Sequence, residues 1–305
     1  MSGHRNAGYR RLVGDDLSVG LFAPLAGADT DPPRIDRELA LARRAESLGV
    51  DAIWARDVPT YWPTFGDAGQ VYDPWVYLSA LAAVTDDVAL ATGGVVLSVR
   101  HPLHVAASAA SLDRASGGRL VLGVGSGDRD PEYAAFGVDP DDRGTRFREA
   151  VAVVRTVWGE SFPEDASRFG TLDGTVDPLP RPESEVPVLV TGHARQDLDW
   201  IADHADGWLF YQLPRDTLEG FLADWRAATD AHKPFVMGLT LELAADPDAG
   251  PAHVHQGFRA GADWVRSYLR DLREAGVDHV AVSLRGDRDP EATLEAFAGD
   301  VLGPL

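Results

Sequence analysis

Two consecutive strand–helix units with glycine-rich strand ends occupy residues 88–139 and constrain the fold more than any other feature. Each apolar strand breaks into glycines, and an alanine-rich helical stretch separates the two strands. The glycines are Gly93, Gly94, Gly123, Gly125 and Gly127. Because glycine has no side chain to pack in a buried strand, it often marks a close approach of the backbone to another group. Two such units in succession favour a parallel barrel built around a flat ligand.

The alternation of apolar strands and helical stretches continues along the whole chain. We expect strands at residues 17–25, 50–56, 88–97, 120–124, 186–191, 207–211, 235–243 and 279–284. Besides the alanine-rich helix, we expect helices at residues 34–48, 75–84, 143–158, 195–204, 217–229, 262–275 and 290–297. Eight such units predict a (β/α)8 TIM barrel rather than a doubly wound sheet.

The barrel is expected to be a single domain that spans residues 1–305. In this interpretation residues 1–16 are a polar N-terminal tail. Residues 160–186 are rich in Pro, Asp, Glu and Gly and are interpreted as an insertion before strand five, with a short hairpin around residues 172–175.

Composition excludes several classes of function. The chain has no cysteine, so it has no disulfide framework and no thiolate nucleophile. We find no apolar run of about 18 residues, and therefore expect no membrane span. The first residues are polar and lack the apolar core of a secretory signal, so a cytoplasmic location is expected.

The chain is strongly acidic. It has 28 Lys and Arg against 48 Asp and Glu, a formal net charge of −20, and Lys233 is its only lysine. A dispersed negative surface repels nucleic acid and anionic membranes, so we expect neither as a partner. Such a surface stays hydrated in concentrated salt, which favours a halophilic source.

Catalytic residues of TIM barrels lie just after the strands, at their carboxyl ends. After strand two, Arg56 and Asp57 form either a structural ion pair at the rim or part of a catalytic site. After Thr92, the pair Gly93 and Gly94 serves either tight packing or a peptide that lies against a ring. Further along the chain come Arg100, His101 and His104. We expect His101 at a helix start facing the mouth, and His104 packed.

The ends of strands four and five offer two further sites. Strand four ends in Gly125, Ser126, Gly127 and Asp128, whose spacing does not match the dinucleotide-binding fingerprint. Strand five runs into Thr191, Gly192, His193, Ala194, Arg195 and Gln196, followed by a helix. Free backbone N–H groups and an arginine at a helix start suit a phosphate, although an ordinary helix cap is the alternative.

No metal or acyl-transfer site is expected. His253 and His255 form a pair, but no third ligand lies at a matching strand end. There is no G-x-S-x-G sequence for a serine nucleophile.

The chain resembles the bacterial luciferase-like flavin monooxygenases from residue 17 to its last helix. The stretches that carry the resemblance are GGVVLSVRHPLHVA, SLDRASGGRLVLGVGSGD and AFGVD. The features WARDVP, FGDAGQVYDPWVYL and TGHARQDLDWIADHADGW are similar to those of a luciferase-type oxidoreductase subgroup.

This resemblance implies a cofactor and an assembly. It implies reduced FMN, or the deazaflavin coenzyme F-420, bound over the barrel mouth. It also implies a homodimer that packs the helices at residues 75–84 and 105–111 against their copies. By position, a non-proline cis peptide falls at Gly93 and Gly94, and Gly125 and Ser126 fall near the reactive edge of the ring. The residues that grip the phosphate fall at Thr191, Gly192, His193, Ala194, Arg195 and Gln196.

Two positions depart from luciferase itself. Val58 stands after Asp57, where luciferase has a catalytic histidine, and Gly125 replaces a cysteine. We therefore expect neither light emission nor an aldehyde substrate.

The resulting hypothesis is a monooxygenase that uses O2 and reduced FMN, supplied by a separate flavin reductase, on a small organic substrate. The cofactor carries the hard chemistry, while the protein orients and shields it. His101, Asp57 and Arg100 are the candidates for proton transfer or substrate anchoring, and the loops at residues 58–72 and 244–257 are candidate lids.

Three alternatives stay open. A deazaflavin-dependent hydride-transfer enzyme would need basic residues for a longer anionic tail. The candidates are Arg129, Arg143, Arg146 and Arg259. A non-catalytic flavin-binding protein and a metal-dependent hydrolase are the other two, since a fold alone never proves an activity.

Overall fold

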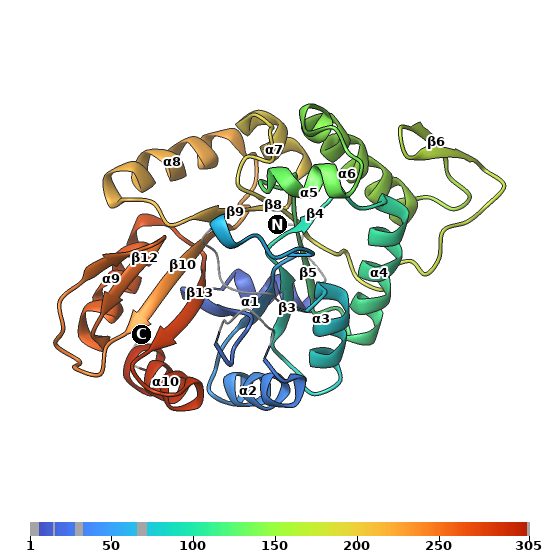
Figure 1. Cartoon of the computed structure of the whole chain (residues 1–305). Coiled ribbons are helices and arrows are strands. Elements are labelled where there is room, and N and C mark those ends of the chain that lie inside the picture. Colours follow the sequence, from blue (N-terminus) through green and yellow to red (C-terminus); the bar gives the residue numbers. More distant parts are fainter. Residues whose placement is uncertain (1–5, 15, 28–32, 66–71, 304–305) are drawn as a thin grey trace.

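Eight parallel strands close into a barrel in the computed structural model, which describes residues 6–14, 16–27, 33–65 and 72–303 (Figure 1). Each strand pairs with its neighbour in chain order, and the last pairs with the first. The strands are β1 (Ser18–Phe22), β2 (Ala52–Ala55), β3 (Ala89–Thr92), β5 (Leu120–Gly125), β8 (Val188–Thr191), β9 (Gly207–Tyr211), β10 (Phe235–Leu243) and β13 (His279–Gly286). The predicted (β/α)8 TIM barrel is confirmed.

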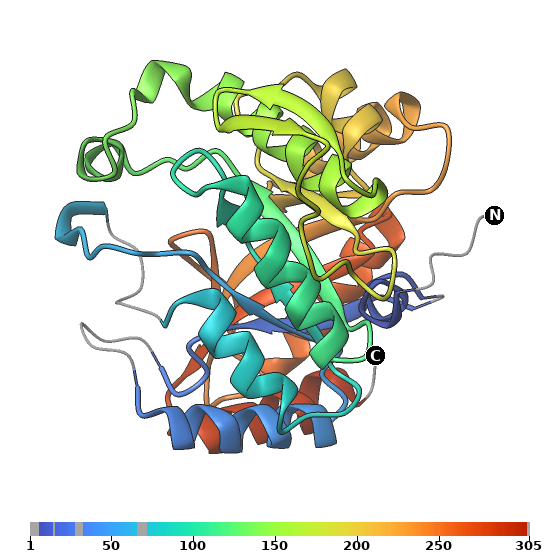
Figure 2. The same ribbon diagram turned by 90° about the vertical axis from the view of Figure 1, so that its right-hand side faces the viewer.

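Helices surround the barrel on its outside (Figures 1 and 2). The longer ones are α2 (Ile35–Ser47), α3 (Pro74–Ala82), α4 (Pro102–Ala115), α6 (Arg143–Gly159), α8 (Arg215–Ala228) and α9 (Ala262–Ala275). The shorter ones are α5 (Asp130–Ala135), α7 (Leu198–His204) and α10 (Pro290–Ala296), with η1 (Pro63–Phe65), η2 (Pro140–Asp142) and η3 (Phe297–Leu302). Within the described ranges no helix is long and apolar enough to cross a membrane.

The barrel strands bury both of their faces, which explains their continuous apolar runs. Along β2, Ile53 and Ala55 belong to the layer between strands and helices, whereas Trp54 belongs to a second cluster inside the barrel. This alternation follows from the period of two along a strand. The interior cluster also contains Val121, from β5.

A short helix closes the end of the barrel where the strands begin. Helix α1 (Ala7–Leu12) starts after Asn6, whose side chain accepts a hydrogen bond from Tyr9 N at 2.7 Å. Leu12 is fully buried in the interior cluster. The expected polar tail over residues 1–16 therefore contains a plug. This helix could not be predicted, because six residues are too few to show a helical period of apolar positions.

A buried histidine ties this plug to the strands. His279 Nε2 accepts from Trp54 Nε1 at 3.0 Å, so His279 Nδ1 carries the proton and donates to Ser18 Oγ at 2.6 Å. Ser18 Oγ in turn donates to Leu12 O at 3.2 Å. Complete burial lowers the pKa of His279 to about 3.

The chain between α6 and β8 forms an antiparallel hairpin, β6 (Glu164–Ser167) and β7 (Gly170–Asp173). Its turn is at residues 168–169, so the expected turn at residues 172–175 is wrong. Asp173 pairs with Glu164 at the open end, and the Asp173 side chain accepts from Thr175 N where the chain leaves the hairpin. Asp173 and Gly174 therefore lie where the chain leaves the hairpin, and the turn that joins the two strands lies elsewhere.

Two other boundaries differ from expectation. The helix predicted from residue 195 begins at Leu198, because Ala194 and Arg195 adopt left-handed backbone angles (φ 46° and 61°) that a right-handed helix excludes. The expected loop at residues 244–257 includes β11 (Ala252–Val254), which pairs with β12 (Gly257–Ala260). The described part of the loop at residues 58–72 ends at Phe65 and resumes at Tyr72.

The neutral His279 makes stability depend on pH. The folded state binds its proton near pH 3 and the unfolded chain near pH 6.5, so stability falls as pH decreases from 6.5 towards 3. We expect the wild type to lose about 2.5 kcal/mol more than His279→Gln between pH 7 and pH 4.5, since glutamine cannot take up a proton. Urea unfolding of both proteins at the two pH values measures this difference. Equal losses would contradict it.

Candidate active site

The floor of the candidate site is backbone, at the point where β3 and β5 approach each other. Thr92 Oγ1 donates to Gly123 O at 2.7 Å. A Cβ atom on Gly123 would lie 1.9 Å from Thr92 O, so no other residue fits there. The glycine in the middle of β5 is thus explained by a close strand approach.

The peptide between Gly93 and Gly94 is cis, as the resemblance implied. A Cβ on Gly94 would lie 2.6 Å from Thr191 Oγ1 of β8, and one on Gly93 would lie 2.8 Å from the Phe22 ring of β1. After this bend the chain continues as β4 (Val95–Val96), which pairs with the end of β5. The predicted residues of strands three, four and five therefore meet at one place.

The hydroxyl of Thr191 is buried beside this glycine backbone. Among the described residues it has no hydrogen-bond partner. A buried hydroxyl without a partner costs free energy, and a bound ligand with a polar atom would remove that cost. The partly exposed backbone of Gly93 and Gly94, beside a hydroxyl without a partner, is where a planar heterocyclic ring such as a flavin would fit.

The segment after β8 is a tight loop rather than a helix start. Gly192 O accepts from Trp208 Nε1 at 2.6 Å, and Gly192 N donates to Leu209 O at 2.8 Å. The His193 ring is exposed and packs edge-on against Trp208 and Phe210. The helix start expected at residue 195 is therefore wrong, and the phosphate contact of residues 191–196 stays a prediction.

Of two side chains in this loop, Arg195 is exposed and Gln196 is buried and hydrogen-bonded. The Arg195 Cβ lies 3.0 Å from where a Cβ on Gly144, at the start of α6, would be. Gln196 is buried, donates to Gly144 O at 3.0 Å and accepts from Arg148 Nε. Gln196 thus fastens the loop to α6, and Arg195 is the side chain of the two that can reach a ligand.

The buried Asp57 forms an ion pair with the partly exposed Arg100. The Asp57 side chain is 1% exposed and accepts from Arg100 Nη2 at 2.6 Å and Arg100 Nε at 2.7 Å. It also accepts from Val96 N at 3.0 Å, and Arg100 reaches Asp73 at 3.0 Å. Sequence reasoning considered Arg56 as the partner, but Arg100 takes both carboxylate oxygens. The pair holds β4, and its proposed part in proton transfer stays a prediction.

His101 caps α4 and contacts the insertion. Its Nδ1 accepts from Leu103 N at 3.3 Å, so Nε2 bears the proton and donates to Phe169 O at 3.0 Å. His101 is exposed, and both its nitrogens are used in these contacts. His104, expected to be packed, is exposed beside His101, because position 104 falls on the outer face of α4.

The loop after β5 is shaped by hydroxyl groups. Ser98 Oγ and Tyr133 Oη both donate to Ser126 O, at 2.5 and 2.6 Å. Gly127 has φ of 84°, and a Cβ there would lie 2.8 Å from the Tyr133 oxygen. Ser126 is buried, and its carbonyl oxygen accepts both of these hydrogen bonds.

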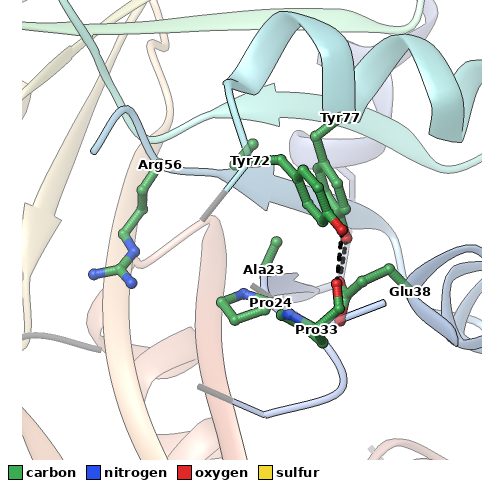
Figure 3. A pocket seen from close by; sticks show the side chains of 8 residues that line it. Ala23, Pro24, Pro33, Glu38, Arg56, Tyr72 and Tyr77 are labelled. Atoms are coloured by element: carbon green, nitrogen blue, oxygen red, sulfur yellow. Dashed lines mark hydrogen bonds between the residues drawn. The ribbon is translucent and has the colours of Figure 1, made fainter. Parts of the chain in front are cut away.

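A narrow pocket lies at the rim, outside the floor. Figure 3 shows Tyr72 and Tyr77 side by side, with the Tyr77 hydroxyl directed at Glu38. The buried Glu38 accepts from Tyr77 Oη at 2.7 Å and from Leu25 N and Ala26 N. Only about 10 Å³ is open to a water-sized molecule, which suits one water and no substrate. The lining residues are Ala23, Pro24, Pro33, Glu38, Ala55, Arg56, Tyr72 and Tyr77.

The four arginines considered for an anionic tail all have protein partners. Arg143 pairs with Asp130 and Arg259 with Asp287, both near the surface. Arg146 Nε donates to Ser98 O. Arg129 is buried and lies 4.0 Å from Glu132. Glu132 was missed by sequence reasoning, since one acid in an acidic chain carries no signal.

Comparison with known proteins assigns the family. Residues 17–300 match the model of the luciferase-like monooxygenases, and the chain belongs to this family of oxidoreductases. An F420-dependent glucose-6-phosphate dehydrogenase of Beutenbergia cavernae is 30% identical over 79% of this chain and 72% of its own length. The pyrimidine monooxygenase RutA of Pantoea ananatis is 28% identical over 94% and 84%.

The fold is shared with solved structures of the same kind. An F420-dependent secondary alcohol dehydrogenase, in complex with an F420–acetone adduct, superposes with a TM-score of 0.78. It is 20% identical and the match covers 94% of this chain and 98% of that one.

The Asp57–Arg100 pair predicts a large difference between two similar substitutions. Asp57→Asn should lower the free energy of unfolding by about 2–3 kcal/mol, because Arg100, which is 26% exposed, loses its charged hydrogen bonds to a buried carboxylate. Asp73→Asn should cost less than about 1 kcal/mol, because Asp73 is 42% exposed and asparagine still caps α3. Urea unfolding measures both. A similar loss in the two variants would show that the Asp57 pair is not the main support of β4.

Proposed function

We propose that this protein is a flavin-dependent oxidoreductase of the monooxygenase type, which uses reduced FMN and O2 on a small organic substrate. The observation that carries the proposal is the glycine floor formed by Gly93, Gly94 and Gly123, with the orphan hydroxyl of Thr191 beside it. The ring of the cofactor would lie on this floor, and Thr191 Oγ1 would hydrogen-bond to it.

Reduced FMN, when bound, supplies two electrons. With the two protons that reduced FMN also carries, one oxygen atom of O2 would enter the substrate and the other would leave as water. This chain's own contribution is to bind, orient and exclude water. The Asp57–Arg100 pair keeps β4 in place, and Arg195 is our candidate for a phosphate contact.

Deazaflavin-dependent hydride transfer is the second candidate function. It is favoured by the identity of 30% to an F420-dependent dehydrogenase. We rank it second because Arg129, Arg143, Arg146 and Arg259 are already engaged by protein partners. A longer anionic tail would have to compete for them.

Anaerobic titration with reduced FMN and with reduced coenzyme F-420 tests the cofactor. We expect tighter binding of FMN, and about tenfold weaker binding by Thr191→Val, since one hydrogen bond is lost. Thr191→Ser keeps the hydroxyl and serves as the matched control. The unfolding midpoint of Thr191→Val should not fall, because the hydroxyl has no protein partner to lose.

Each other outcome has a clear meaning. Tighter binding of coenzyme F-420 would favour hydride transfer. Binding of FMN without consumption of O2 or reductant, in the presence of candidate substrates, would favour a flavin-binding protein. Failure of both cofactors to bind would refute the site.

We also propose that the protein is a homodimer packed through α3 and α4. Val76 on α3 is 66% exposed and lies on one of the two helices through which the resemblance implies that the dimer packs. Val76→Glu should convert a dimer into a monomer in sedimentation-velocity experiments at micromolar concentration. Val176→Glu is the control, because Val176 is similarly exposed (56%) but lies in the insertion. A wild-type protein that sediments as a monomer would refute the proposal.

A further inference from the structure

The loop that follows β2 is attached to the helix that follows β5, two strands away around the barrel mouth. Thr60 Oγ1 donates to Glu132 Oε1 of α5 at 2.8 Å. Arg129, just before α5, places its guanidinium 4.5 Å from the centre of the Phe65 ring and donates to Thr60 O at 3.4 Å. We call these four residues, Thr60, Phe65, Arg129 and Glu132, the mouth clasp.

The strand order shows which part of the barrel the mouth clasp spans. β2 and β5 are not neighbours, because β3 lies between them in the barrel. A contact between the loop after β2 and the helix after β5 therefore spans the chain that follows Gly93 and Gly94, where Asp57 already accepts from Val96 N. Figures 1 and 2 both show η1, in the loop after β2, close to α5 on the same side of the barrel.

The clasp is built from buried charges. Arg129 is 5% exposed and Glu132 is 4% exposed. Burial, with the charge of Asp57 nearby as a smaller cause, raises the pKa of Glu132. A buried ion pair often stabilises a fold no more than apolar residues of the same volume would, and its best-supported use is to fix one arrangement. Here the Arg129–Glu132 pair would fix the position of the loop at residues 58–65 at the barrel mouth.

We propose that Glu132 and Arg129 are positioning residues that hold residues 58–65 over the glycine floor and so restrict access to the ligand bound there. The part of the proposal that concerns access to a bound ligand rests on the function proposed above. The attachment of the loop can be tested without any ligand.

The first experiment is hydrogen–deuterium exchange of the unliganded full chain. Thr60→Val removes the hydroxyl that reaches Glu132 and changes little else, whereas Thr60→Ser keeps it. We expect exchange of a peptide covering residues 57–65 to be at least tenfold faster in Thr60→Val, with the rest of the barrel unchanged. Thr60→Ser should match the wild type. Equal exchange in Thr60→Val and the wild type would overturn the proposal.

Glu132→Gln provides a second variant. Glutamine can still accept from Thr60 but no longer pairs with the Arg129 charge, so we expect faster exchange at residues 57–65 than in the wild type. A circular dichroism spectrum and an unfolding midpoint near those of the wild type show that either variant is folded. If Glu132→Gln lowers the unfolding midpoint strongly, Thr60→Val alone decides the result.

The second experiment asks whether the loop covers the bound ligand. Acrylamide, a small neutral quencher, is titrated against the fluorescence of oxidised FMN bound to each protein. We expect the quenching constant to rise at least threefold in Thr60→Val, with the FMN dissociation constant changed less than twofold and Thr60→Ser like the wild type. Faster exchange without greater quenching would overturn the proposal, because the loop would then lie away from the ligand.

The two failures are distinguishable. If FMN does not bind, coenzyme F-420, which also fluoresces, replaces it. If neither binds, the proposed function fails, while the exchange experiment still decides whether the clasp holds the loop.

Discussion

The architecture of the mouth depends on how closely two strands approach each other. Gly123 and Thr92 meet at a separation that leaves no room for a Cβ atom, and the Thr92 hydroxyl bonds to Gly123 O across the same gap. Because β3 ends at this contact, the chain can bend at Gly93 and Gly94 and continue as β4. The flat surface beside Thr191 follows from that bend.

Buried polar groups then keep the bend in one arrangement. Asp57 receives the backbone N–H of Val96 and the guanidinium of Arg100, and so links the end of β2 to β4. At the opposite end of the barrel, His279 links Trp54 and Ser18 to the plug helix. The Asp57 carboxylate and the His279 ring are both costly to bury, and both have hydrogen-bond partners. Such contacts fix one geometry more than they add to the stability of the fold.

Much of the fold could be predicted because it follows from local patterns. Apolar runs of regular spacing predicted eight strands, and glycines at strand ends predicted the close approaches at Gly94 and Gly123. The partners of charged side chains could not be predicted, since Asp57 and Arg100 are 43 residues apart and Thr60 and Glu132 are 72 apart. Left-handed angles at Ala194 and Arg195 also escaped, because neither residue type indicates them.

A floor made of backbone also restricts how the binding surface can evolve. At Gly123 any side chain would collide with Thr92, and at Gly94 one would collide with the Thr191 hydroxyl. Substitutions at Gly94 and Gly123 would therefore be poorly tolerated, and the shape of this surface changes little. Variation among descendants of this chain would accumulate instead in the roof, at exposed loop positions such as Tyr61, where a new side chain displaces only solvent. The cofactor wall would stay constant while the opposite wall diversified.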